Sequence, residues 1–367
     1  MIKIKAPEAY INEENILGQS GKYVSEFGKH ALIIGGKTAL ESVGEDFFKS
    51  FRDEKIKYEI EEFHGYCSFE NIDKYSDLST KLGVDIIVGI GGGKVLDLVK
   101  AVGEKADLPV ITVPTIAATC AAWSALSVIY NDIGEHTDYI LLEKSPRLVI
   151  ADTNIISKAP ARYLNAGIGD TIAKWYEAAP HLSESSDITL KIGLQTAKLA
   201  LNILENYANE LQIESKESYI KNQYKDVIDS IIILAGLVGS INGGKHRAAI
   251  GHAIHNGLTY ISDTKGTLHG EKVIFGVIVQ FILEGKSEKE IIDFIDLLNK
   301  LELPVTLEQL GIKDSVDDKI LTIANSVNFN SDELDNLNFQ VNKELIRKAI
   351  IRADELGRDS LSLQAIV

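Results

Sequence analysis

The chain has 367 residues, of which 45% are hydrophobic and 25% are charged, and this composition excludes a disordered or fibrous protein. Domains typically have roughly 100 to 200 residues, so a chain of this length is expected to form two domains. The formal net charge of −15 repels phosphate backbones and anionic bilayers, so it argues against nucleic acid and membranes as partners.

The start of the chain, MIKIKAPEAYINEEN, has no apolar segment of the kind found in a signal peptide. No apolar run approaches the roughly 20 residues that a membrane-spanning helix needs. The two cysteines, Cys67 and Cys120, form no C-x-x-C pair, which argues against a zinc ribbon or a disulfide framework. We therefore expect a cytoplasmic protein with both thiols reduced.

From about residue 31 to residue 152, short β-rich apolar runs alternate with helix-like segments. The runs are ALIIGG, KYEIEEF, VDIIVGI, PVITVP and RLVIAD. This alternation is typical of βαβ units and a parallel, doubly wound sheet. Beyond about residue 160, stretches such as TLKIGLQTAKLALNILENYANEL carry apolar residues at helical spacing. We predict an α/β domain over residues 1–157 and an all-α domain over 158–367, with the boundary near SKAPARYLNAGIG.

The stretch GVDIIVGIGGGKVLDLVKAV predicts a buried strand, a turn at residues 91–93 and an amphipathic helix. Glycines in such a turn let a diphosphate approach the backbone N–H groups at the positive end of the helix, and Lys94 adds a cation. Two better-known motifs do not match, because Lys94 occupies the last glycine position of G-x-G-x-x-G and Val95 the Ser/Thr position of a P-loop. We interpret the stretch as an anion-binding turn; the alternative is a tight turn whose glycines only fit the chain.

Three histidines and one aspartate are candidate metal ligands. His252 and His255 lie one helical turn apart, His269 follows after a SDTKGT loop, and Asp170 opens an apparent helix in AGIGDTIAKWYEA. One Asp and two His would hold a catalytic Zn²⁺ or Fe²⁺ and leave one coordination position open. Spacing alone does not choose between His252 and His255, and an acid at a helix start is often only an N-cap.

Five motifs in matching order resemble the iron-containing alcohol dehydrogenase superfamily, in its glycerol dehydrogenase branch. They are GIGGGKVLDLVKA, PTIAATCAAWSALSVIYND, GIGDTIAKWYEA, GHAIHNGLT and LHGEKV, within residues 7–311. The resemblance implies the fold shared with dehydroquinate synthase. In that fold an N-terminal dinucleotide-binding domain and a C-terminal helical domain enclose NAD(P)(H) and one divalent metal. Homo-oligomers occur among such enzymes, and we expect one here.

The resemblance also assigns roles to individual residues. Asp170, His252 and His269 would be the metal ligands, and His255 would lie beside the metal as a hydrogen-bonding partner or proton relay. The cofactor-binding residues would be Gly92, Gly93, Lys94 and Asp97 at the pyrophosphate, and Thr115, Thr119, Ser124, Leu126 and Tyr130 at the nicotinamide.

Three departures from the family pattern refine these expectations. Lys174 stands where iron-type members place a further histidine, which favours zinc over iron. Cys120 and Trp123 stand in the phrase TCAAW, where glycerol dehydrogenases have a substrate-binding aspartate, which argues against glycerol. Gly36, followed by Lys37, stands where NAD-preferring relatives carry an aspartate that repels a 2′-phosphate, which favours NADP(H) over NAD(H). The alternative is that Gly35 and Gly36 only shape a loop and that NAD(H) is the cofactor.

The TCAAW phrase is most similar to the hydroxycarboxylate dehydrogenase subgroup, which reduces 2-oxo acids with NADPH. A substrate carboxylate needs a nearby cation, and Lys174 or Arg247 could supply it. We expect reversible hydride transfer between NADPH and a small 2-oxo acid, with His255 and Lys174 as catalytic residues and Cys120, Trp123, Lys174 and Arg247 at the substrate. The alternatives are an NAD-linked glycerol dehydrogenase and a metal- and NAD-dependent lyase or cyclase of the dehydroquinate synthase type.

Overall fold

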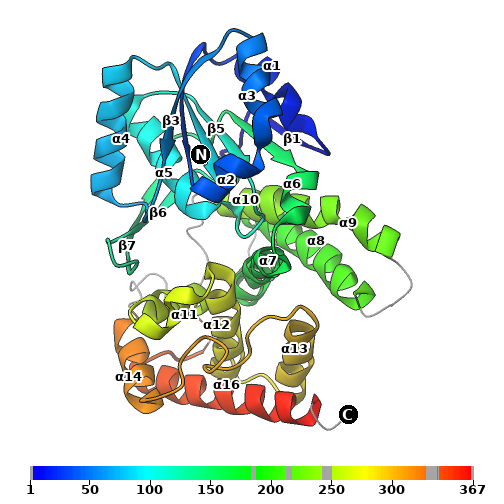
Figure 1. Ribbon diagram of the computed structural model, residues 1–367. Helices are drawn as coiled ribbons and strands as arrows, with labels where there is room; N and C mark the ends of the chain where they lie inside the picture. The colour runs from blue at the N-terminus through cyan, green and yellow to red at the C-terminus, as the bar shows by residue number, and fades with distance from the viewer. Residues whose placement is uncertain are drawn as a thin grey trace. The chain divides into compact units, whose positions relative to one another are not determined.

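The computed structural model describes residues 3–182, 187–211, 217–241, 250–327, 337 and 339–364. Contacts divide the chain into two compact units (Figure 1). The first unit comprises Met1–Leu164 and Tyr224–Gly243, and the second comprises Asn165–Gln223 and Gly244–Val367. The segment 224–243 thus belongs to the α/β unit, although the predicted domains 1–157 and 158–367 place it in the helical one.

This returning segment, residues 224–243, is held by side chains of the first unit that are distant from it in sequence. Asp229 accepts hydrogen bonds from the Tyr10 hydroxyl and from Asn12 Nδ2, both at 2.7 Å. Gly236 packs on the Trp123 ring so closely that a Cβ at Gly236 would lie 2.5 Å from Cγ of Trp123. Such contacts cannot be predicted from a local pattern. The segment contains the end of α9 (Glu217–Asp229), a π-helical turn (Ser230–Leu234) and α10 (Ala235–Ser240).

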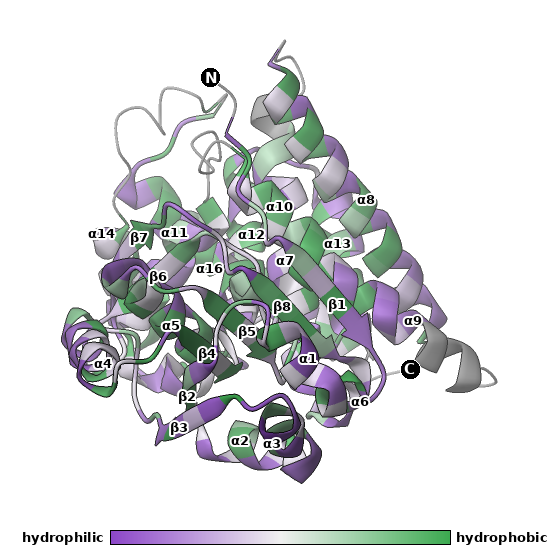
Figure 2. Ribbon diagram, turned by 90° about the horizontal axis from the view of Figure 1, so that it is seen from above, coloured by the Kyte–Doolittle hydropathy of each residue, from purple (hydrophilic) through white to green (hydrophobic). Residues whose placement is uncertain are grey.

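The first unit is built on a six-stranded sheet whose pairings are all parallel. The five apolar runs predicted as strands form β2 (His30–Gly35), β3 (Lys57–Glu62), β4 (Ile86–Gly91), β5 (Val110–Pro114) and β8 (Leu148–Asp152), which confirms the α/β class. The central strands are hydrophobic, whereas the edge strand β3 is largely hydrophilic (Figure 2). In spatial order the strands are β1 (Ala9–Glu13), β8 (Leu148–Asp152), β5 (Val110–Pro114), β4 (Ile86–Gly91), β2 (His30–Gly35) and β3 (Lys57–Glu62).

Helices cover both faces of this sheet because successive side chains of a strand point to opposite sides. On one face, Ile33 packs in a cluster with Phe47 of α3. On the other face, Leu32 packs in a cluster with Leu98 of α5. The helices of this unit are η1 (Ile16–Gln19), α1 (Ser20–Val24), α2 (Lys37–Ser42), α3 (Gly44–Asp53), α4 (Phe69–Leu82), α5 (Gly93–Ala106), η2 (Cys120–Ala122) and α6 (Thr153–Lys158).

Two further elements of this unit have no counterpart among the predicted ones. The edge strand β1 is one. The other is an antiparallel hairpin of β6 (Leu126–Tyr130) and β7 (His136–Leu141), with an irregular register at Ile129/Tyr130.

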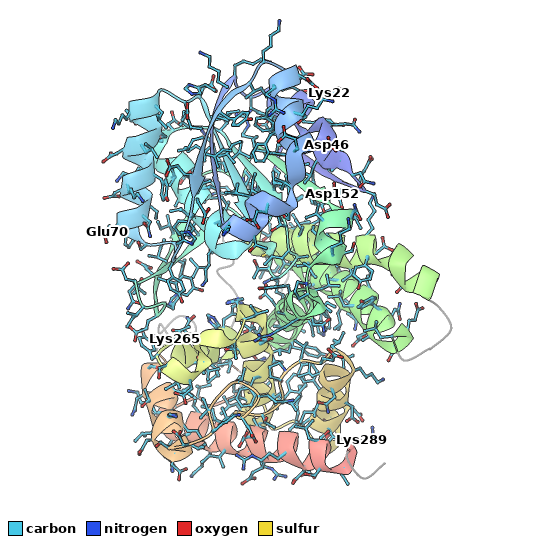
Figure 3. The ribbon with its side chains drawn as sticks, viewed as in Figure 1. Lys22, Asp46, Glu70, Asp152, Lys265 and Lys289 are labelled. Atoms are coloured by element: carbon cyan, nitrogen blue, oxygen red, sulfur yellow. The ribbon has the colours of Figure 1, made fainter. Side chains whose placement is uncertain are left out.

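Asp152, labelled in Figure 3, shows how the carboxyl end of the sheet is fixed. Its buried Oδ1 accepts the backbone N–H of Asn154 at 3.0 Å, which caps α6, and that of Asn15 at 3.1 Å. One carboxylate therefore joins the end of β8 to the turn that follows β1, since it satisfies N–H groups from both segments.

In the second unit, all the described elements are helices, which agrees with the predicted all-α class. The most deeply buried is α12, whose residues from Gly270 to Phe281 are all buried. Among the described residues, no helix combines the length and apolarity that crossing a membrane requires. The helices are α7 (Ala161–Leu182), which begins in the first unit, α8 (Ile188–Glu210), α11 (Ile250–Thr259), η5 (Ser262–Gly266), α12 (His269–Leu283), α13 (Glu288–Lys300), α14 (Val316–Ser326) and α16 (Lys343–Gln364).

Candidate metal centre and dinucleotide-binding turn

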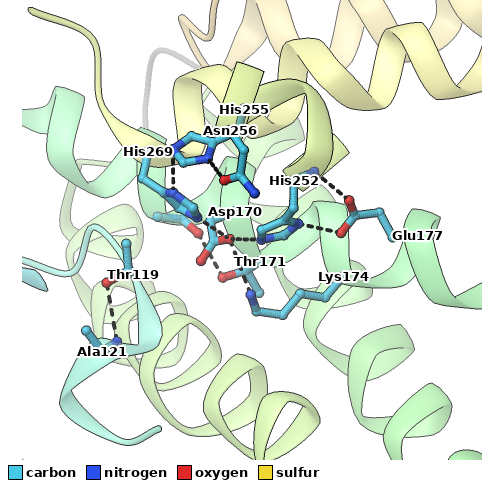
Figure 4. Close-up of polar contacts among 11 residues, drawn as sticks. Thr119, Ala121, Asp170, Thr171, Lys174, Glu177, His252, His255, Asn256 and His269 are labelled. Atoms are coloured by element: carbon cyan, nitrogen blue, oxygen red, sulfur yellow. Dashed lines mark hydrogen bonds and ion pairs between the residues drawn. The ribbon is translucent and has the colours of Figure 1, made fainter. Parts of the chain in front are cut away.

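Three side chains from three helices of the second unit converge at one point (Figure 4). Asp170 comes from α7, His252 from α11 and His269 from the start of α12. The expectation that Asp170 opens a helix is wrong, because α7 begins at Ala161 and Asp170 lies inside it. Oδ1 of Asp170 lies 3.5 Å from Nε2 of His252 and 3.6 Å from Nε2 of His269. The potential ligand atoms all lie within 4.8 Å of one another. These are the three residues that the family resemblance assigns to the metal.

Each of the three residues has a glycine neighbour in the sequence that lets the helices approach closely. A Cβ at Gly270, beside His269, would lie 1.8 Å from the carbonyl oxygen of Ala166 in α7. A Cβ at Gly251, beside His252, would lie 3.0 Å from the carbonyl oxygen of Val273 in α12. A real Cβ atom does not come within 1.8 Å of a backbone oxygen, and 3.0 Å is an unusually tight contact, so glycine at these positions lets the helices approach this closely.

Lys174 lies one helical turn after Asp170, and its ammonium is 3.2 Å from Oδ1 of Asp170. Both side chains are almost completely buried. Burial raises the pKa of the Asp170 carboxyl, but the positive charge of Lys174 and hydrogen bonds from His252 and His269 hold it well below its ordinary value. Asp170 is therefore an ionised carboxylate, which is the form that binds a metal.

Glu177 is a further site residue, which no motif or spacing in the sequence predicts. It is completely buried, and Oε2 lies 2.7 Å from Nδ1 of His252. Burial lowers the pKa of His252, but the negative charge of Glu177 and hydrogen bonds with Asp170 and Glu177 raise it above its ordinary value. The motif GDTIAKWYEA contains this glutamate seven positions after Asp170, on the same helix face.

His255 is buried and contacts His269 rather than Asp170. Its Nε2 lies 3.0 Å from Nδ1 of His269, and its Nδ1 lies 2.9 Å from Oδ1 of Asn256. Burial, together with the positive charge that His269 and Lys272 would carry, holds the pKa of His255 well below its ordinary value. Burial also lowers the pKa of His269. Both rings are therefore neutral near neutral pH, and each has one donor and one acceptor nitrogen.

The donor set fits a divalent transition metal. One carboxylate oxygen and two imidazole nitrogens form the three-ligand arrangement of catalytic zinc and iron sites, which leaves a position for substrate. Each imidazole has a partner on its second nitrogen, Glu177 for His252 and His255 for His269. Such partners fix the ring so that its other nitrogen faces the metal.

The glycine turn of the first unit has the geometry of an anion site. β4 ends at Gly91, whose φ of 152° is a conformation that other residues rarely adopt. Gly92 is the N-cap of α5, and a Cβ there would lie 2.6 Å from Cδ1 of Ile116. Lys94 is exposed, and its ammonium lies 4.0 Å from the centre of the Tyr66 ring. The helix start and Lys94 together can hold a diphosphate.

Asp97 has a structural role that its sequence motif does not predict. Its Oδ1 lies 2.9 Å from the ammonium of Lys100, and its Oδ2 accepts the N–H of Val128 at 3.3 Å. Lys100 is itself buried and donates to the carbonyl oxygens of Ser124 and Leu126. The pair thus anchors residues 124–128 to α5, so Ser124 and Leu126 are held by α5 through their backbone.

The remaining predicted site residues lie in several places. Gly36 is the N-cap of α2, with an ordinary φ of −73° and no atom within 4 Å of a Cβ placed on it; the exposed Lys37 follows. Thr119 accepts the N–H of Ala121 at the start of η2 (Figure 4), and Cys120 is half-buried there. Arg247 lies outside the described residues.

Other side chains of this region are packed inside the first unit. Thr115 is buried and donates its N–H to Gly91, and the Tyr130 ring contacts Tyr66 at 5.9 Å between centroids. Trp123 is only 9% exposed and packs on Gly236 of the returning segment, so its position is explained by packing within this unit.

Comparison with known proteins identifies the family. The family model for iron-containing alcohol dehydrogenase matches residues 7–153. The glycerol dehydrogenase of Citrobacter freundii is 32% identical over 98% of this chain and 99% of its own length. Hydroxycarboxylate dehydrogenase A of Escherichia coli K12 is 35% identical over 79% of this chain and 80% of its own. The crystal structure of a probable glycerol dehydrogenase from Sinorhizobium meliloti 1021 matches with a TM-score of 0.86 and 28% identity, covering 97% of this chain and 99% of that one.

The lyase or cyclase alternative finds no support in these relatives, which are named as dehydrogenases. The similarity to the glycerol dehydrogenase of Citrobacter freundii covers 98% of this chain and therefore extends over both units. The chain therefore belongs to the iron-containing alcohol dehydrogenase superfamily, in its glycerol dehydrogenase branch, and is a nicotinamide-dependent dehydrogenase that acts on CH–OH groups.

Proposed function

We propose that this protein interconverts a small hydroxy compound and its carbonyl compound at a divalent metal held by Asp170, His252 and His269. The observation that carries the proposal is the convergence of one carboxylate oxygen and two imidazole nitrogens within 4.8 Å. When bound, the metal supplies Lewis-acid polarisation of the substrate oxygen, and the nicotinamide supplies or accepts a hydride.

The protein's own residues prepare this chemistry. Asp170 remains ionised beside Lys174, and Glu177 and His255 orient the two imidazoles. The geometry of His255 favours the orienting role over a proton relay, since its Nε2 is engaged with His269 and its Nδ1 with Asn256. Lys174 places a buried positive charge beside Asp170, where it can attract an oxygen that becomes negative during reduction.

We propose zinc as the metal, although the name of the family refers to iron. Three protein ligands are sufficient for a catalytic zinc site, and a buried lysine occupies the position one turn after Asp170 where a fourth ligand would lie. An ammonium has no lone pair to offer a metal. Elemental analysis of the purified protein tests this assignment, and stoichiometric iron that supports turnover would overturn it.

For the substrate we propose a short polyol of the glycerol type and the corresponding hydroxyketone. Relatives named as glycerol dehydrogenases that match nearly the whole chain support this substrate better than the 2-oxo acid expected from the phrase TCAAW. The second candidate is a 2-oxo acid. It is favoured by the buried cation Lys174 and by Cys120, which stands in the phrase TCAAW in place of an aspartate.

We also propose that the cofactor site accepts NADP(H). Gly36 has an ordinary backbone conformation and open space at its Cβ, so neither strain nor packing requires glycine there. With Gly36 after β2, this position has no carboxylate that would bind the ribose hydroxyls of NAD(H) and repel the 2′-phosphate of NADP(H).

The decisive experiment is a panel of initial rates followed by the absorbance of the reduced nicotinamide. Zinc-loaded enzyme is tested with NADH and NADPH against dihydroxyacetone, glycolaldehyde and several 2-oxo acids. We expect the highest kcat/KM with a hydroxycarbonyl compound. A clear preference for a 2-oxo acid would support the second candidate, whereas no consumption of either cofactor with any substrate would overturn the proposed class of substrates.

A further inference from the structure

We propose that Glu177 is a positioning residue of the metal centre, which fixes the tautomer and the orientation of His252 and supplies the negative charge that offsets Lys174. This inference rests on the proposed metal site. It concerns a residue whose role the sequence motifs do not indicate, and it explains why a carboxylate lies completely buried beside a metal ligand.

Glu177 contacts His252 in two ways. Oε1 accepts the backbone N–H of His252 at 2.9 Å, and Oε2 lies 2.7 Å from the ring Nδ1. An ionised carboxylate can only accept hydrogen bonds, so Nδ1 must carry the proton. The ring must be neutral to bind a metal, and its lone pair is then on Nε2, the nitrogen that faces Asp170 at 3.5 Å. The two contacts fix both the backbone and the ring of this ligand.

The surrounding helices are shaped to admit this carboxylate. A Cβ at Gly251 would lie 2.9 Å from Oε1 of Glu177, so a side chain at position 251 would displace it. Gly276 of α12 packs against the same point, because its Cβ would lie 2.6 Å from the carbonyl oxygen of Gly251. The start of α11 is therefore held between Glu177 and α12, which limits how far His252 can move.

Charge gives a second reason for a glutamate at this position. Asp170, Lys174 and Glu177 are all buried, so two carboxylates and one ammonium leave one net negative charge. Without Glu177 that net charge would be zero, and the ammonium 3.2 Å from Asp170 would oppose the binding of a dication. At the other imidazole, His269, the partner is His255, which is an imidazole and not a carboxylate.

The test compares the metal affinities of Glu177→Gln and Glu177→Ala with that of the parent chain. Zn²⁺ affinity is measured by competition with a chromogenic chelator, and the visible spectrum of the Co²⁺-loaded protein reports the geometry of the ligands. We expect Glu177→Ala to weaken Zn²⁺ binding by about 10- to 100-fold and to alter the Co²⁺ spectrum. Glu177→Gln keeps an oxygen acceptor but loses the charge, so it should recover part of that loss.

Asp354→Asn is the matched control. Asp354 is also a buried carboxylate of this unit and accepts the backbone N–H of Leu307 at 2.7 Å, but it belongs to α16 and is not one of the site residues. We expect it to lower the melting temperature without changing Zn²⁺ affinity or the Co²⁺ spectrum. If Glu177→Ala does not fold, Glu177→Gln alone decides the question.

The outcomes separate the two proposals. Unchanged Zn²⁺ affinity and an unchanged Co²⁺ spectrum in the Glu177 variants, with a parent chain that binds metal, would overturn the positioning role alone. Equal weakening by Asp354→Asn would also overturn it, since the effect would then be one of general stability. A parent chain that binds neither metal would overturn the proposed metal site and this inference with it.

Discussion

Gly270 and Ala166 touch at the crossing of α12 and α7, where a Cβ on Gly270 would lie 1.8 Å from the Ala166 carbonyl oxygen. Asp170 follows one turn after Ala166, and His269 directly precedes Gly270. The backbone contact therefore sets the distance between two of the candidate metal ligands. Packing and metal binding depend on the same contact.

Gly270→Ala should accordingly destabilise the second unit and weaken metal binding together. The added methyl group has no room against a backbone carbonyl, and overpacking of this kind typically costs about 1–3 kcal/mol. Gly266→Ala is the control, because Gly266 is exposed and has nothing within 4 Å of a Cβ placed on it. Urea unfolding and a Zn²⁺ titration of both variants make the measurement. Parent-like stability of Gly270→Ala would contradict the close contact.

His252→Ala should abolish turnover while nicotinamide nucleotide still binds. His252 provides one of three metal-binding atoms in the second unit, whereas the glycine turn and Lys94 belong to the first unit. We expect a loss in kcat on the order of 100-fold or more, since the substrate oxygen loses its Lewis acid. Fluorescence titration with NADPH checks that the cofactor site remains. Full activity of the metal-stripped variant would refute the role of the metal.

Gly36→Asp should shift the cofactor preference from NADP(H) toward NAD(H). The variant is expected to fold normally, because the backbone at Gly36 suits any residue and the space beside it is open. A carboxylate there repels a 2′-phosphate, so the ratio of kcat/KM for NADPH to that for NADH should fall by about tenfold or more, about 1.4 kcal/mol. If a folded variant keeps the ratio of the parent chain, residues other than Gly36 determine the preference for NADPH over NADH.

Tyr66 should contribute to diphosphate binding through Lys94, whose ammonium lies 4.0 Å from the ring centre. A cation–π contact at an exposed site is worth about 0.5–1 kcal/mol, so Tyr66→Leu should weaken ADP binding by about two- to fivefold. Tyr66→Phe keeps the ring face and serves as the control. Calorimetric titration with ADP and with adenosine distinguishes this effect from a general loss of fold, because adenosine carries no diphosphate and its binding should not change.

Four of the five strands that the sequence predicts consist of residues that share one environment, and the edge strand β3 is the exception. β2, β4, β5 and β8 are buried along nearly their whole length, so they appear as continuous apolar runs. β1 is an edge strand in which only Asn12 is buried, and β7 is a largely exposed and polar strand of a hairpin. Neither leaves an apolar run, so neither is recognisable from periodicity.

The residues of the candidate site also divide into those that a local sequence pattern predicts and those that it does not. Spacing alone leaves His252 and His255 equivalent, and in the sequence only the family motif separates them. The side chain that distinguishes them in space, Asp170, lies on another helix, and a local pattern does not show which histidine faces it. Glu177 and Lys100 are not foreseen because a charged residue inside a helix pattern is usually solvated. Their burial depends on partners from α11 and from residues 124–128, which a local pattern does not contain.

Tyr176 should contribute to the loss of stability at alkaline pH. It packs edge-on against Phe281 and Phe294, and burial, followed by the negative charge of Glu205, raises its pKa to about 12. An unfolded tyrosine ionises near pH 10. Between those values the unfolded state has lost the proton that the folded state retains, so the free energy of unfolding falls as the pH rises. The contribution is fully present below pH 10.

A shift of about two pKa units corresponds to about 3 kcal/mol, which is an upper limit for this residue. Tyr176→Phe removes the ionisable group and keeps the ring, so its stability should decline less steeply over the same pH range. Tyr139→Phe is the control, because Tyr139 is exposed on β7. Denaturant unfolding curves at successive alkaline pH values give both slopes. If Tyr176→Phe and the parent chain lose stability in parallel, the Tyr176 hydroxyl is not held protonated by its surroundings.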